Sequence, residues 1–297
     1  MRNFLIIVFL LITESSLSQI NCLQIKGNEN EPVPYASVFV KKMNKTFIAD
    51  SAGNICSKGL QAIEKEDTIF VSAVGYEESA FVFSDAMLII LQKRNILLPE
   101  VMIVDGKGKI EMWGTKKNPT PVMGYFCHWG FREILNSSAR IIFPEGEYKK
   151  AEILSVAFFD ETGKEQNVPV RIRVYLIGKD SLPYADYLTD NVIVETKGKG
   201  WLTTNFETYG LIFPKEGLAF GIELFATGDE NYYYRTWKGS DKKKHNEKVY
   251  GFSLGMEKSE TSLTLMKLDV WNPWKIDSAI PRICGNLVCR VKVRVWR

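Results

Sequence analysis

The chain has 297 residues, of which 45% are hydrophobic and 25% are charged, enough apolar residues for two hydrophobic cores. Its formal net charge of +3 is too small to indicate a nucleic-acid-binding protein or one held on a strongly anionic membrane. Aromatic residues make up 12% of the chain, which favours a β-rich fold and supplies rings for stacking against a ligand.

Residues 1–18 are typical of a secretory signal peptide. Arg2 supplies a positive charge, residues 4–12 form an apolar core, and small serines stand at the −3 and −1 positions before Gln19. An apolar run of nine residues is too short to cross about 30 Å of hydrocarbon, so we expect cleavage rather than membrane anchoring.

Export would place the mature chain in the periplasm, at the outer membrane or outside the cell. A lipid-anchored form is the alternative and would be attached through Cys22, but the preceding Ile20-Asn21 is a poor match to a lipoprotein signal. No other segment of the sequence is long and apolar enough to cross a membrane, so we expect no transmembrane segment in the mature chain.

Residues 19–104 predict a small β-sandwich. Short apolar or β-branched runs occupy residues 35–40, 68–74, 81–83 and 87–91. The turn formers of Asp50-Ser51-Ala52-Gly53 separate the first two runs, and two prolines at 32 and 34 prevent a helix from starting before them. Short strands at a spacing of roughly ten residues are typical of a sandwich.

Four ordered pieces of this region carry a family resemblance: residues 34–38 (Pro-Tyr-Ala-Ser-Val), 50–53 (Asp-Ser-Ala-Gly), 71–76 (Val-Ser-Ala-Val-Gly-Tyr) and 98–101 (Leu-Pro-Glu-Val). In this order they resemble the carboxypeptidase regulatory-like domain, a transthyretin-like sandwich common in exported proteins of Bacteroidetes-type bacteria and often N-terminal to outer-membrane receptors. The resemblance covers residues 20–104 and implies a fold and a cell-envelope location. It implies no active site, because such domains carry no catalytic residues of their own.

Two features depart from that family. The opening Gly-x-Val strand is degenerate in residues 23–27, and Phe47-Ile48 stand where the family has Gly-Thr before the turn.

Residues 105–125 predict a linker. The stretches 106–109 and 116–121 are polar, and their Gly and Pro residues interrupt both helical and strand periodicity. A structured arm that clasps one of the domains is the alternative.

Residues 126–297 predict a second domain, an antiparallel sandwich. Strand patterns cover residues 152–159, 168–177, 191–195, 201–206, 218–225, 232–237, 249–254, 263–268 and 287–295. About nine strands without intervening helices favour this architecture. The segments 171–175, 200–201 and 213–218 are similar to jelly-roll, galactose-binding-like modules.

Two of these strands alternate apolar and basic residues. The basic positions are Arg171, Arg173, Arg290, Lys292 and Arg294. If the two strands are neighbours, their outward side chains form one basic face that would bind an acidic glycan, a lipopolysaccharide phosphate or an acidic partner. Otherwise such rows are the solvated side of a sheet or charges that discourage edge pairing.

Exposed aromatic residues are the preferred ligand-binding candidates. Trp271 and Trp274 flank two turn residues, and Tyr233 on a strand would face away from its neighbours Tyr232 and Tyr234. Flat aromatic faces suit sugars and partner proteins. Packing in the sandwich core or at its rim is the alternative interpretation.

The sequence offers few groups for catalysis or metal binding. Its two histidines, His128 and His245, lie in no HExxH or HxxE element, and the lysine-rich surroundings of His245 predict a solvated loop. Cys127 precedes His128, but adjacent residues on a strand point to opposite faces, so they do not form a nucleophile–base pair. We therefore expect no catalytic residue, metal site or cofactor.

Acidic residues provide two further hypotheses. A glycosidase pair would be drawn from Asp186, Asp190, Glu195 and Glu223, and a structural calcium site from Asp180 together with Asp186 and Asp190. No spacing distinguishes these residues from ordinary surface charge.

Five cysteines, an odd number, leave at least one without a partner in the chain. Cys284 and Cys289 flank a predicted hairpin tip and are the candidate disulfide. Burial of both as small apolar residues is the alternative.

These patterns predict an exported, all-β protein with a small transthyretin-like sandwich and a larger jelly-roll-like sandwich. The leading hypothesis is a non-catalytic cell-envelope protein, with a docking module followed by a domain that binds a glycan or a protein partner. The alternatives are a glycan hydrolase with a carboxylate pair in the second domain and a structural subunit of an outer-membrane assembly.

Overall fold

The computed structural model describes residues 22–84, 88–95, 103–116, 136–161, 168–224, 232–238, 242–250, 253–259, 263–267, 275–276 and 285–297. Its regular elements are strands, apart from two short 3-10 helices, η1 (Lys58–Ala62) and η2 (Glu207–Tyr209). The predicted all-β class is therefore confirmed. Within these ranges, no helix has the length and apolarity that a membrane crossing requires.

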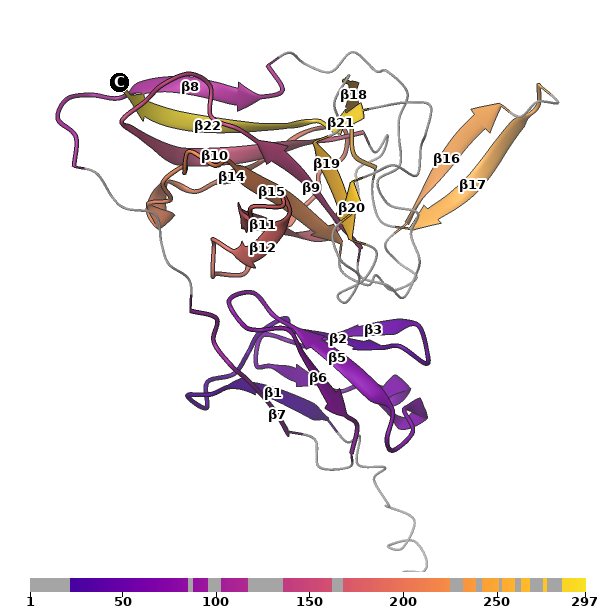
Figure 1. The fold of residues 1–297 in the computed structure, drawn as a ribbon. Coiled ribbons are helices and arrows are strands. Elements are labelled where there is room, and N and C mark those ends of the chain that lie inside the picture. Colours follow the sequence, from indigo (N-terminus) through magenta and orange to yellow (C-terminus); the bar gives the residue numbers. More distant parts are fainter. Residues whose placement is uncertain are drawn as a thin grey trace, which may run out of the picture.

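The N-terminal part is a small sandwich of two sheets (Figure 1). Its strands are β1 (Leu23–Gly27), β2 (Ser37–Val40), β3 (Lys45–Ile48), β4 (Asn54–Ile55), β5 (Thr68–Ser72), β6 (Ser79–Val82) and β7 (Leu88–Leu91). One sheet has the order β4-β1-β7 and the other the order β3-β2-β5-β6. Alternate residues of β1, Leu23 and Ile25, enter a core that they share with Val38 and Val71 of the second sheet.

The rest of the chain contains a larger second sandwich. The strands of this part are β8 (Lys109–Gly114), β9 (Asn136–Ile142), β10 (Lys150–Asp160), β11 (Pro169–Ile177), β12 (Pro183–Asp186), β13 (Val192–Glu195), β14 (Gly200–Asn205), β15 (Leu218–Leu224), β16 (Tyr232–Lys238), β17 (Lys244–Tyr250), β18 (Met256–Lys258), β19 (Thr264–Lys267), β20 (Lys275–Ile276), β21 (Gly285–Leu287) and β22 (Cys289–Trp296). A four-stranded sheet of order β14-β10-β22-β8 and a seven-stranded sheet built around β11, β15 and β9 enclose one core. Strands β16 and β17 form a separate hairpin.

Strand β8 corrects the predicted linker. It pairs antiparallel with the last strand, β22, and places Trp113 in the core, where its ring centroid lies 4.9 Å from that of Phe213. Residues 109–114 are therefore a sheet strand, and the linker prediction does not hold for them. The chain therefore begins its second sandwich before the predicted boundary at residue 126.

The cysteine pairing also differs from the prediction. Cys289 carries a free, buried thiol, because the alternation of β22 turns it into the core, so the predicted bridge to Cys284 is wrong. Burial raises the pKa of that thiol to about 12. The disulfide that forms joins Cys22 to Cys56, which adjoin the paired residues Leu23 and Ile55 of β1 and β4.

We expect this disulfide to stabilise the N-terminal sandwich. It closes a loop across a sequence separation of 34, for which the chain-entropy model gives about 3–4 kcal/mol. The Cys22→Ser/Cys56→Ser double variant should therefore melt at a lower temperature in scanning calorimetry. Reduction should lower the melting temperature of the unmodified protein and of a Cys289→Ala control, and no change on reduction would contradict the pairing.

Candidate functional site: the cleft between the two sandwiches

The outer face of the seven-stranded sheet is built from cross-strand pairs. Arg171 on β11 lies opposite Glu223 on β15, and Glu223 in turn lies opposite Ser137 on β9. Two residues further along β11, Arg173 lies opposite Gly221. A Cβ atom at Gly221 would come within 2.7 Å of a ring carbon of Tyr175, so glycine leaves room for the ring.

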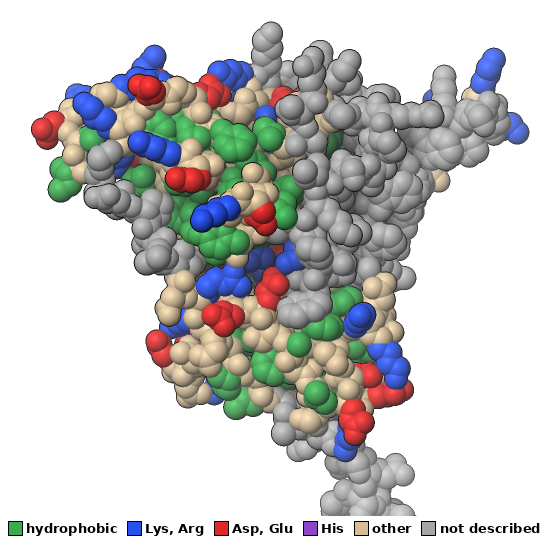
Figure 2. Space-filling model, in the orientation of Figure 1, with side chains coloured by type: hydrophobic (Ala, Val, Ile, Leu, Met, Phe, Trp, Pro, Cys, Tyr) green, Lys and Arg blue, Asp and Glu red, His purple; other side chains and the backbone are tan. Residues whose placement is uncertain are grey.

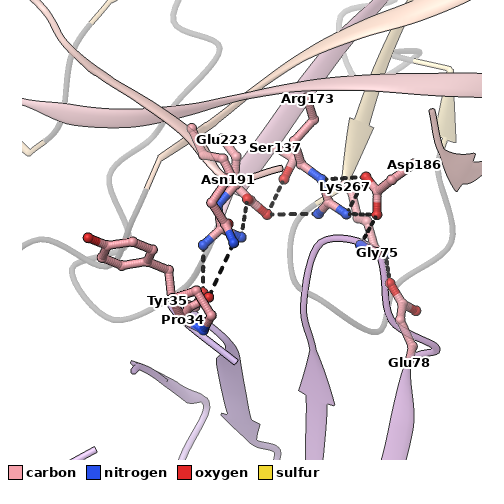
Figure 3. Close-up of polar contacts among 11 residues, drawn as sticks. Pro34, Tyr35, Gly75, Glu78, Ser137, Arg173, Asp186, Asn191, Glu223 and Lys267 are labelled. Atoms are coloured by element: carbon pink, nitrogen blue, oxygen red, sulfur yellow. Dashed lines mark hydrogen bonds and ion pairs between the residues drawn. The ribbon is translucent and has the colours of Figure 1, made fainter. Parts of the chain in front are cut away.

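Four charged side chains form a buried network on this face (Figure 3). Arg173 donates from Nη2 to both carboxylate oxygens of Asp186 at 2.7 Å, and its Nη1 donates to Glu223 Oε1 at 3.4 Å. Arg171 Nη1 lies 3.0 Å from Glu223 Oε2. The side chains of Arg171 and Glu223 are 1% and 3% exposed, so water does not screen this pair.

The ionisation states of Glu223 and Arg173 follow from burial and from the charged side chains that they contact. Burial opposes ionisation of Glu223, but the guanidinium groups of Arg171 and Arg173 outweigh it and lower the pKa of the carboxyl group. Burial likewise disfavours the charge on Arg173, but Asp186, Tyr175 and Glu223 together outweigh it, so the pKa of the guanidinium is raised well above its ordinary value. Two cations and two carboxylates thus give a network of no net charge.

The predicted basic face does not form. Arg171 and Arg173 lie on the seven-stranded sheet, where Arg171 is buried and the side chain of Arg173 is 11% exposed. Arg290, Lys292 and Arg294 lie on β22 of the four-stranded sheet, across the core. That prediction is wrong because its two strands are not neighbours. The alternation itself is right, since Val170, Ile172 and Val174 enter the core while the arginines point the opposite way.

On the four-stranded sheet, two of the three basic residues have partners of their own. The guanidinium of Arg290 lies 3.8 Å from the ring centroid of Trp201, and Arg294 donates to Glu152 at 2.9 Å. The basic side chains of β22 therefore lie on the outer face of the four-stranded sheet.

The buried network also binds the N-terminal sandwich. Arg171 Nη2 donates to the carbonyl oxygen of Tyr35 at 2.6 Å, and Asp186 Oδ2 accepts from the backbone N–H of Gly75 at 3.5 Å (Figure 3). Tyr35 has a φ of 55°, which is uncommon for a residue other than glycine. Two loops of the small sandwich, before β2 and after β5, are therefore held against the charged face.

Further contacts surround these hydrogen bonds. Arg94 Nη1 donates to the carbonyl oxygen of Tyr184 at 2.5 Å, and Lys267 Nζ donates to Glu78 at 2.8 Å. An apolar cluster joins Phe39 and Phe70 of the small sandwich to Ile193 on β13. Figure 2 shows basic and acidic side chains gathered where the two sandwiches meet.

A cavity of about 310 Å³ remains at this junction. The small sandwich contributes Tyr76, Glu78 and Arg94 to its lining, and the large one contributes Arg173, Tyr175 and Tyr184. Tyr184 is 57% exposed, so its ring is accessible to a ligand at the rim. The cavity thus combines aromatic rings with hydrogen-bonding groups of both signs.

The other candidate residues are placed as follows. Trp271, Trp274, Cys127, His128 and Cys284 lie outside the described residues. Tyr233 lies on β16, where only the backbone is described. His245 lies on strand β17, so the solvated-loop prediction is wrong at that residue.

The acidic candidates do not form one site. Asp186 and Glu223 are bound to arginines, whereas Asp190 and Glu195 are exposed and Asp180 accepts from the backbone N–H of Leu182 at 3.1 Å. In the part of the chain that the structure describes, no group of three or more His, Cys, Asp or Glu side chains is arranged to hold a metal ion.

Comparison with protein-family models, curated proteins and solved structures found no match. The resemblance of residues 20–104 to carboxypeptidase regulatory-like domains therefore stays a prediction.

One signal in the sequence does point to the buried network. Strand β15 reads Leu-Ala-Phe-Gly-Ile-Glu-Leu, with apolar residues on both faces, and every position in it is buried. A glutamate in such a strand requires a buried cation as its partner. The nearest basic residues on a similarly apolar strand are Arg171 and Arg173.

We expect Glu223→Gln to destabilise the protein by about 3–5 kcal/mol at pH 7, because the substitution leaves two buried arginines short of a carboxylate. The folded-state pKa of Glu223 lies below its ordinary value of 4.5, so its stabilising contribution is complete above that pH and is lost as the pH falls through the folded-state pKa. Urea unfolding followed by tryptophan fluorescence should therefore show a difference between the two proteins that narrows below pH 4.5.

The matched control is Glu195→Gln, which neutralises an exposed carboxylate on β13. It should change the free energy of unfolding by less than about 0.5 kcal/mol. Equal effects of the two substitutions would contradict the role given to Glu223.

Proposed function

We propose that this chain is a non-catalytic, exported cell-envelope protein in which the N-terminal sandwich docks on the C-terminal sandwich and the cleft between them binds a glycan. A protein partner is the second ligand class. The observation that carries the proposal is the cavity at the junction, to which both sandwiches contribute aromatic and hydrogen-bonding side chains.

The chemistry of the cleft suits a neutral, hydroxyl-rich ligand. Four of its charged groups form ion pairs, Lys267 with Glu78 and Arg173 with Asp186, and hold fixed positions. The other two charged lining residues, Arg94 and Asp180, have opposite signs, so the lining as a whole has no net charge. Sugar hydroxyls both donate and accept hydrogen bonds, which such a lining offers. The exposed ring of Tyr184 provides an apolar face for the C–H side of a pyranose.

A binding role also agrees with the state of the carboxylates. Glycoside hydrolysis requires one carboxyl group that stays protonated near neutral pH and gives its proton to the leaving oxygen. Glu223 has the opposite property, a lowered pKa, and its oxygens face Arg171 and Arg173. These facts favour the non-catalytic interpretation over the glycan-hydrolase alternative for this cleft.

Two observations support export. The first 18 residues have the pattern of a signal peptide, and the disulfide between Cys22 and Cys56 is of the kind that persists in oxidising compartments. The disulfide also uses the Cys22 thiol that a lipid-anchored form would need. The resemblance of the small sandwich to regulatory-like domains adds a role as a docking module.

The experiment is a glycan array probed with the mature chain, residues 19–297, followed by titration of any ligand found. Tyr184→Ala should weaken binding about tenfold, equivalent to about 1.4 kcal/mol, by removing the ring at the rim of the cleft. Tyr209→Ala is the matched control, because Tyr209 is also exposed but lies on η2, outside the cavity lining.

A Trp271→Ala/Trp274→Ala double variant tests the other aromatic candidates. Loss of binding only in this variant would move the site away from the cleft. Hydrolysis of an envelope glycan or peptide by the purified chain would contradict the non-catalytic role. Absence of glycan binding, with co-purification of an outer-membrane complex, would favour the structural-subunit alternative.

A further inference from the structure

The positive charge of the chain is concentrated in one hairpin. Residues 232–250, which comprise β16, β17 and the residues between them, contain six lysine and arginine residues and two acidic residues, a net charge of +4. The whole chain has a net charge of +3, so all remaining residues together carry −1. Lys242 and Lys243 directly precede β17, which begins at Lys244, and all three lysines are exposed.

This hairpin stands apart from both sandwiches (Figure 1). Strand β16 pairs with β17 through seven residue pairs, from Tyr232 with Tyr250 to Lys238 with Lys244. No other strand in the described ranges joins this two-stranded sheet. A seven-residue strand at about 3.4 Å per residue spans about 24 Å, so the lysines lie at the far end of a long arm.

An isolated two-stranded ribbon is marginally stable in water, and it gains stability when a further surface contacts it. The residue types of the arm indicate which surface. Lysine is a compact cation that attracts phosphate groups. Trp237 pairs with His245, one position from the pair Lys238–Lys244 at the end of the hairpin. Tryptophan is enriched at the boundary between lipid headgroups and hydrocarbon.

We propose that the β16–β17 hairpin docks on the surface of an anionic lipid bilayer, with the three lysines among the phosphate headgroups. The small net charge of the whole chain does not oppose this interaction. At physiological ionic strength a charge is screened beyond about 8 Å, so only charges that reach the surface attract it. The arm holds the body of the protein about 24 Å away, several screening lengths, where its slight negative charge has no effect.

The test uses sedimentation of the mature chain with vesicles. One set contains 30% phosphatidylglycerol in phosphatidylcholine, and the other contains phosphatidylcholine alone. Binding should require the anionic lipid and fall steeply between 50 and 500 mM NaCl. Each lysine at an anionic surface contributes about a fivefold factor in affinity, so a Lys242→Gln/Lys243→Gln/Lys244→Gln variant should bind about a hundredfold more weakly.

The matched control removes the same charge from the body of the protein. Lys41, Lys58 and Lys197 are exposed and lie outside the hairpin, so a triple glutamine variant at these positions should keep its affinity. Circular dichroism and calorimetry of both variants would show that the sandwiches remain folded.

Equal losses in the two variants would overturn the proposal, because they would show that overall charge rather than the arm drives binding. Absence of binding to anionic vesicles at 50 mM NaCl would also overturn it. Binding of the unmodified chain to a soluble acidic polysaccharide such as polygalacturonate, without binding to vesicles, would replace the membrane with an acidic glycan. None of these three results would test glycan binding in the cleft, because the cleft lies elsewhere on the molecule.

Discussion

The pairing of two buried arginines with two buried carboxylates determines how the two sandwiches are joined. Removing an ion from water costs several kcal/mol, so Arg171 and Arg173 are tolerable in this position only because Glu223 and Asp186 compensate them. Compensation within the large sandwich is incomplete, since Arg171 also donates to the carbonyl oxygen of Tyr35 in the small one. The N-terminal sandwich therefore completes a hydrogen-bond network that begins in the C-terminal sandwich.

The buried ionic network fixes the orientation of the two sandwiches relative to each other as well as holding them together. The apolar contact of Phe39 and Phe70 with Ile193 is tolerant of small rotations, because dispersion contacts have little angular preference. Hydrogen bonds from a buried guanidinium to one carbonyl oxygen are not tolerant, because a displaced donor is left without water. The ionic network thus fixes the relative orientation of the sandwiches, and with it the shape of the cleft.

Local periodicity predicted the faces of strands better than their surroundings. Alternation in β11 correctly separated the side of Val170 and Ile172 from the side of Arg171 and Arg173. It did not indicate that the second side is covered, because a period of two says which side chains share a face and not what packs against that face. The covering element comes from residues more than 100 positions earlier, which no local pattern connects to β11.

The disulfide and the first strand of the large sandwich were missed for a related reason. Cys22 and Cys56 are brought together by the pairing of β1 with β4, a register that neither segment encodes alone. Cys284 and Cys289 are close in sequence, but the pleat of β22 turns Cys289 into the core. Residues 109–114 look like part of a polar linker until β22, at the other end of the chain, supplies their hydrogen-bond partners.

The net charge of the whole chain, like local periodicity, does not show where in the fold the charged residues lie. The value of +3 is a sum over a body of −1 and a hairpin of +4, and these two parts meet different surroundings. Charges at the junction of the sandwiches are neutralised within a few ångströms by fixed partners, so they organise the fold and exert little field outside it. The charge of the hairpin is not balanced within its own sequence, and no other strand in the described ranges pairs with the hairpin. The role of each charge in this protein therefore depends on its position. A charge at the junction of the sandwiches stabilises the fold, whereas a charge on the hairpin is available to a binding surface outside the molecule.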